Sequence, residues 1–145
     1  MTVEAPTRFA VDSNVIAYLF SGDAARADRA EALVMQRTPK PVISTQVMNE
    51  VTLVMKRKMG LPWPEINVLM GDVEEFCEIV PLTLEVHKEA RRIAEHYGFR
   101  FYDSCIIAFA LLEDCEVIYT EDMQHGQVIF DGSVAVRVSG REMSI

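Results

Sequence analysis

The sequence has few cysteines, and their spacing excludes two common uses of that residue. Cys77, Cys105 and Cys115 are three in number and form no Cys-x-x-Cys pair. An odd, scattered set of this kind indicates neither a disulfide framework nor a zinc site. Cys105 lies in an apolar stretch and is interpreted as a small core residue, because no neighbouring residue in the sequence would activate its thiol.

Long apolar runs and targeting segments are also missing. No run is long enough to cross a bilayer, and residues 1–8 lack the charged and apolar regions of a secretory signal. Repeats and low-complexity linkers are absent from the sequence as well. We therefore expect one cytoplasmic domain over residues 1–145, long enough to bury a sizeable core and without a membrane partner.

Basic residues are scarce relative to acidic ones. The chain has 14 Lys and Arg residues against 22 Asp and Glu residues, a net charge of −8. This balance argues against a protein that holds nucleic acid by bulk electrostatic attraction. It is compatible with a nuclease whose gathered acids hold cations that meet phosphate, and with a protein that binds a positively charged partner.

One segment of the chain, residues 102–112, is apolar almost all round. That pattern is typical of a helix buried in the middle of a domain. Asp103 stands in its first turn. An acid that opens a buried helix is either a cap or a ligand, and the remaining acids of the chain bear on that choice.

Short apolar strands alternate with helices along the rest of the sequence. Strands are predicted at residues 9–11, 42–43, 79–80, 116–120 and 135–138, and helices at residues 23–35, 46–58, 64–75, 84–97 and 102–112. Thr83 is a predicted helix cap, and Gly98 a predicted helix end. The alternation predicts an α/β fold of three layers, α/β/α, with a short central parallel sheet.

Four acids stand where these predicted elements begin or end. Asp12 and Asp122 directly follow strands, Asp103 begins a helix, and Glu50 lies at the border between the apolar and polar sides of its helix. In open α/β sheets the site lies beyond the carboxyl ends of the strands. Each acid alone has an ordinary explanation as a cap, a turn residue or a solvated side chain.

Taken together, the four acids indicate a cation. Carboxylates held close repel one another, and burying unpaired charge is costly, so a fold gathers them only around a positive charge. An all-oxygen ligand set suits Mg²⁺ or Mn²⁺. Such ions lower the pKa of bound water and neutralise charge on a phosphoryl group. The chemistry predicted is phosphodiester hydrolysis by a metal-activated water, without a covalent intermediate.

Four groups of residues along the chain form an ordered pattern: Val11-Asp12-Ser13-Asn14-Val15; Ser44-Thr45 with Glu50; Tyr102-Asp103-Ser104 with Ile106 and Ala108; and Thr120-Glu121-Asp122. In the order and spacing of these groups the chain resembles a PIN domain in the single-domain form of VapC-type toxins. The likeness runs from near Phe9 to about Val138, nearly the whole chain.

The resemblance implies a metal-dependent endoribonuclease, the toxin of a type II toxin–antitoxin pair. Carried over by position, the implied acidic quartet is Asp12, Glu50, Asp103 and Asp122. Asp12 and Asp103 would be the chief ligands of Mg²⁺ or Mn²⁺, while Glu50 and Asp122 would bind a second ion or orient water. Ser13 or Asn14, and Thr120, match positions that help by hydrogen bonding. The implied partners are an RNA substrate, a cognate antitoxin and a second copy of the chain in a homodimer.

One position departs from the family's pattern. Many members carry a further Asp two residues beyond the position of Asp122, where this chain has Gln124. A second metal site is therefore expected to be weak; Glu121 is a possible substitute, although Asp122 is the better match. Two other functions stay open: a non-catalytic RNA- or protein-binding module, and an acid-metal phosphoesterase that acts on DNA.

Overall fold

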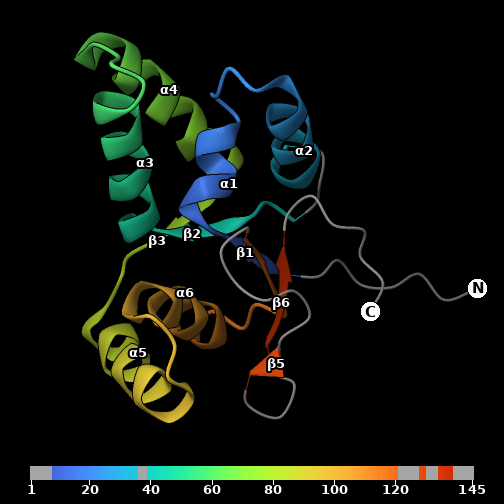
Figure 1. Cartoon of the computed structure of the whole chain (residues 1–145), viewed down its shortest axis with the longest axis vertical. Helices are drawn as coiled ribbons and strands as arrows, with labels where there is room; N and C mark the ends of the chain where they lie inside the picture. The colour runs from blue at the N-terminus through green and yellow to red at the C-terminus, as the bar shows by residue number, and fades with distance from the viewer. Residues whose placement is uncertain (1–7, 36–38, 121–127, 130–133, 139–145) are drawn as a thin grey trace, which may run out of the picture.

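In the part of the chain that the structure describes, six short strands form one sheet at the centre of the molecule (Figure 1). The computed structural model describes residues 8–35, 39–120, 128–129 and 134–138. The strand order is β3-β2-β1-β4-β6-β5. The strands are β1 (Phe9–Val11), β2 (Val42–Ser44), β3 (Glu78–Val80), β4 (Val117–Thr120), β5 (Val128–Ile129) and β6 (Val134–Val138). Neighbouring strands from β3 to β6 pair in parallel, which confirms the predicted parallel sheet, and β5 is an antiparallel edge strand.

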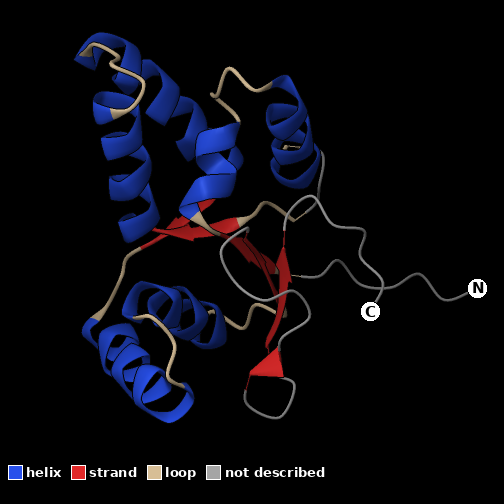
Figure 2. Ribbon diagram, in the orientation of Figure 1, coloured by secondary structure: helices blue, strands red, loops and turns tan. Residues whose placement is uncertain are grey.

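Helices cover the sheet on both faces, as Figure 2 shows. One face carries α1 (Ser13–Tyr18), α2 (Ala24–Val34), α3 (Thr45–Arg57) and α4 (Trp63–Phe76), and the other carries α5 (Leu84–Tyr97) and α6 (Phe101–Leu112). The predicted three-layer α/β/α architecture is confirmed. Among the helices of the described residues, none combines the length and the apolar character needed to cross a membrane.

The core is divided in two by the sheet, because successive strand side chains point to opposite faces. In β1, Phe9 and Val11 pack into the cluster beneath α1 to α4, and Ala10 packs into the cluster beneath α5 and α6. In β4, Tyr119 and Ile118 divide between the same two clusters. Both strands are buried at every position, so their near-continuous apolar sequence follows from cover on both faces.

Capping residues fix where the helices begin and end. The hydroxyl of Ser44 accepts a hydrogen bond from the Val47 amide at 3.3 Å, and that of Thr83 accepts one from the Val86 amide at 3.2 Å. Gly98 ends α5 in the left-handed conformation, with φ of 72°. The predicted limits of α5 are therefore confirmed. Ser44 ends β2 and Asp12 follows β1, so both lie at the carboxyl edge of the sheet.

Two glycines are expected to respond in opposite directions to replacement by alanine. Apart from its neighbours in the sequence, a Cβ added at Gly71 or at Gly98 would have no atom within 4 Å. The effect of each substitution on stability therefore depends on backbone conformation alone. Gly98→Ala is expected to lower the free energy of unfolding by about 1–2 kcal/mol, because its left-handed φ strains an L side chain. Gly71→Ala, inside α4, is expected to raise it by about 0.5–1 kcal/mol. Urea denaturation of both variants measures the two shifts, and equal signs would contradict this account.

Candidate active site

A cavity of about 230 Å³ opens at the carboxyl edge of the sheet, between the start of α1, the first turns of α3 and the first turn of α6. Three of the four predicted acids contribute to its wall. Its lining residues are Asp12, Ser13, Asn14, Ser44, Gln46, Val47, Glu50, Leu82, Tyr102, Asp103, Cys105 and Ile106. The site therefore lies where open α/β sheets place their ligands.

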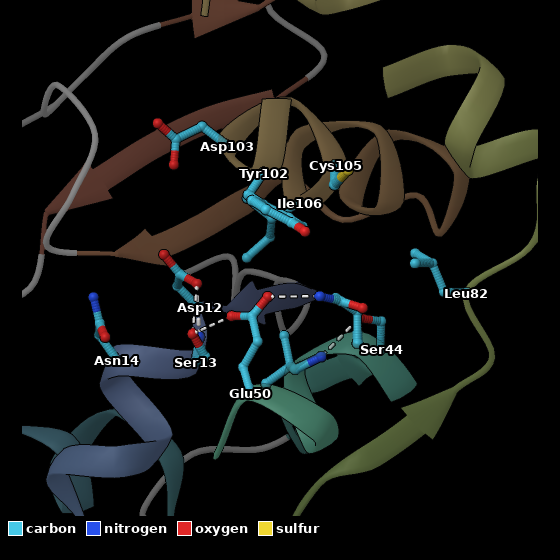
Figure 3. A pocket seen from close by; sticks show the side chains of 12 residues that line it. Asp12, Ser13, Asn14, Ser44, Glu50, Leu82, Tyr102, Asp103, Cys105 and Ile106 are labelled. Atoms are coloured by element: carbon cyan, nitrogen blue, oxygen red, sulfur yellow. Dashed lines mark hydrogen bonds between the residues drawn. The ribbon is translucent and has the colours of Figure 1, made fainter. Parts of the chain in front are cut away.

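Asp12 and Glu50 form one wall of this cavity and are joined through Ser13 (Figure 3). Asp12 is the N-cap of α1, and its Oδ1 accepts a hydrogen bond from the Ser13 amide at 2.7 Å. The Ser13 hydroxyl donates to Glu50 Oε2 at 2.6 Å. On the other side, Gln46 Nε2 donates to Glu50 Oε1 at 3.0 Å. Both oxygens of the Glu50 carboxylate are thus anchored by neighbouring side chains.

The end of β4 holds the second oxygen of Asp12. The hydroxyl of Thr120, a fully buried residue, donates to Asp12 Oδ2 at 2.9 Å. The Asp12 amide donates to the carbonyl of Tyr119 at 3.0 Å. Hydrogen bonds to both carboxylate oxygens and to the backbone fix the orientation of Asp12 before any ligand binds.

Asp103 faces these residues from the opposite wall (Figure 3). It lies in the first turn of α6, but the N-cap of that helix is Arg100, whose side chain makes no cap hydrogen bond. Asp103 Oδ2 instead accepts a hydrogen bond from Arg100 Nε at 3.1 Å. Asp103 is therefore not the cap of its helix, although a negative charge in the first turn is favoured by the helix dipole.

The structure brings three of the four predicted acids to one cavity but does not bring them into a closed ligand cluster. No three Asp, Glu, His or Cys side chains of the described residues lie close enough together to hold one ion. Asp122 and the alternative acid Glu121 lie outside the described residues, as does Gln124. The supporting residues Ser13 and Asn14 line the cavity, and Thr120 reaches it through Asp12.

Cys105 packs against the core cluster beneath α5 and α6, as its interpretation as a core residue expects, but it is only half-buried and also lines the cavity. Burial raises the pKa of its thiol, and the negative charge of Glu50 raises it further, so the thiol stays protonated and neutral at neutral pH. The helical spacing of Tyr102, Cys105 and Ile106 is the sequence signal for a shared face. Gln46 carries a similar signal, because it stands one helical turn before Glu50.

The profile of the PIN domain family matches residues 9–130. Since this match spans most of the chain, the protein belongs to the PIN domain family. Comparison with curated proteins gives no match.

Three solved structures share the fold. A toxin–antitoxin complex from Klebsiella pneumoniae has a TM-score of 0.63 and 19% identity, over 80% of this chain and 87% of that one. VapC20 from Mycobacterium tuberculosis, described as a sarcin-ricin loop cleaving toxin, has a TM-score of 0.63 and 16% identity, over 76% and 86% of the two chains. VapBC2 from Rickettsia felis, bound to a DNA fragment from its promoter, has a TM-score of 0.62 and 17% identity, over 90% and 98%. At such identities the likeness is one of fold.

Proposed function

We propose that this protein is a metal-dependent endoribonuclease, the toxin of a type II toxin–antitoxin pair. The observation that carries the proposal is the cavity itself. Three carboxylates from separate elements line it, and the described lining residues include no Lys or Arg. A PIN domain with this charge pattern is suited to hold cations against a phosphate backbone. VapC20, which shares the fold, is described as a toxin that cleaves the sarcin-ricin loop.

The donor chemistry of the cavity fits Mg²⁺ or Mn²⁺. Asp12 and Glu50 on one wall and Asp103 on the other offer oxygen atoms, which these hard ions prefer. We assign Asp12 and Asp103 as the chief ligands, with Glu50 and Asp122 binding a second ion or orienting water. A bound ion would supply an activated water and neutralise charge on the phosphoryl group.

The surrounding side chains keep the acids in place for this reaction. Asp12 is held by the Ser13 amide and the Thr120 hydroxyl. Glu50 is held by the Ser13 hydroxyl and Gln46. A carboxylate fixed in this way needs little reorganisation when a phosphodiester binds, and such preorganisation is a major source of catalytic power.

The proposal includes two protein partners, a cognate antitoxin and a second copy of the chain. Two of the structures that share the fold are described as a toxin–antitoxin complex and as VapBC2. The net charge of −8 on this chain favours a partner that carries positive charge.

Cleavage assays on mixed RNA test the proposed function. The purified chain is incubated with Mn²⁺ or Mg²⁺, with and without a chelator. We expect cleavage with either ion and none with the chelator, because the acids alone cannot neutralise the phosphate. Competition with DNA of the same sequence separates a ribonuclease from a DNA phosphoesterase. RNA binding without any cleavage would contradict the proposal and favour a non-catalytic binding module.

A further inference from the structure

Arg100, at the N-cap position of α6, contacts Asp103, one of the acids that line the cavity. We propose that Arg100 is the counter-ion of Asp103 while the cavity holds no metal ion, and that it becomes a phosphate-binding residue once an ion and RNA occupy the site. This inference rests on the proposed function and names a substrate-binding residue for the same site.

The ion pair between Arg100 and Asp103 is weak enough for a metal ion to replace Arg100. Arg100 Nε lies 3.1 Å from Asp103 Oδ2, and the two side chains are 75% and 20% exposed. Exposed ion pairs contribute little to stability, since water screens them. A divalent ion carries twice the charge of a guanidinium and binds carboxylate oxygen directly, so it would displace Arg100 from Asp103.

The backbone of Arg100 is fixed even though its side chain is exposed. Its carbonyl accepts hydrogen bonds from the Ser104 amide at 3.0 Å and the Ser104 hydroxyl at 3.1 Å. Ser104 is fully buried, which anchors this turn within the protein. A displaced guanidinium therefore stays within reach of the cavity mouth, and only its rotamer changes.

Charge decides where the displaced guanidinium would bind. Asp12, Glu50 and Asp103 line the cavity, and of the ion pairs formed within the described part of the chain, the one that reaches a lining carboxylate is Arg100–Asp103. Once a metal ion binds Asp103, an RNA phosphate bound to that ion would be the anion nearest to Arg100. Arginine matches phosphate because its planar fork donates two parallel hydrogen bonds.

Mn²⁺ binding to the RNA-free protein tests the first half of the proposal. Arg100→Gln is expected to tighten Mn²⁺ binding about threefold, because it removes a competing cation. The matched control is Arg92→Gln, which breaks a similar exposed i,i+3 pair with Glu89 on α5 and is expected to leave the affinity unchanged. Electron paramagnetic resonance of free Mn²⁺ gives the dissociation constants. Equal or weaker binding by Arg100→Gln would overturn the proposal.

Steady-state cleavage at several salt concentrations tests the second half. Arg100→Gln is expected to raise KM for RNA with little change in kcat, and to flatten the slope of log(kcat/KM) against log salt by about 0.7, the loss of one phosphate contact on a single strand. Arg100→Lys, which keeps the charge and loses the fork, is expected to fall between wild type and Arg100→Gln. An unchanged KM and slope would overturn this half. If wild type binds Mn²⁺ and cleaves RNA, and Arg100→Gln has the same Mn²⁺ affinity, KM and salt slope, this inference is rejected and the proposed function stands.

Discussion

Asp12→Asn is expected to lower kcat/KM for metal-dependent RNA cleavage by about a thousandfold or more, an effect of about 4 kcal/mol on the transition state. The carboxylate of Asp12 is, under our proposal, a chief ligand of the ion that neutralises phosphoryl charge. Asparagine has almost the same shape. Its carbonyl can still accept from the Ser13 amide, and the Thr120 hydroxyl can rotate to accept from its NH₂. The loss therefore reports the missing charge and not a disturbed fold.

Cleavage of end-labelled RNA with Mn²⁺ measures this effect, and circular dichroism with a urea midpoint checks that the variant is folded. Asp114→Asn is the matched control. Asp114 is an exposed acid just after α6 and has a φ of 55°, a conformation that asparagine also adopts. We expect its activity to equal that of wild type. Metal-dependent cleavage retained by folded Asp12→Asn would count heavily against the nuclease assignment.

Ile107→Ala is expected to lower the free energy of unfolding by about 2–5 kcal/mol. Ile107 is 1% exposed and belongs to the cluster packed between the sheet and the pair α5 and α6. Truncation removes apolar burial and leaves a cavity that the surrounding helices fill only in part. Because a typical domain has about 5–15 kcal/mol of stability in total, this single change is expected to consume a large part of it.

Urea denaturation monitored by circular dichroism measures the shift. Leu112→Ala on the same helix is the control, since Leu112 is 40% exposed and its truncation is expected to change stability by less than about 1 kcal/mol. Cleavage per folded molecule should be the same in both variants, because neither side chain lines the cavity. Similar losses of stability in the two variants would contradict the assignment of Ile107 to the core.

Most of the fold is readable from local sequence signals. Ser44 and Thr83 are short polar residues just before apolar-periodic segments, and both cap helices. Strand β4 and helix α6 are apolar on all sides because both are covered. The boundaries shift by a residue: Phe101, just outside the helix predicted at residues 102–112, is the first residue of α6. β5 is not predictable, because two residues carry too little pattern.

The place of the cavity is predictable from the sequence, but the contacts within it are not. The rule that sites follow the carboxyl ends of strands places Asp12 at the edge of the sheet where the cavity opens, and the helical period places Glu50 at the border between the apolar and polar sides of its helix. The bond from Ser13 to Glu50 and the pair between Arg100 and Asp103 depend on side-chain rotamers and on how three separate elements pack. A sequence pattern predicts neither the rotamers nor the packing. The convergence of Asp122 with the other acids stays a prediction.

The lining carboxylates come from the end of β1, from α3 and from α6, so the cavity exists only after both layers of helices have docked on the sheet. Any ligand that needs all three carboxylates binds the native chain and not the unfolded one. By mass action such a ligand draws the population toward the folded state, by about 2.7 kcal/mol at a hundred times its dissociation constant. The supply of that ligand would then govern how long each molecule survives heat and proteolysis.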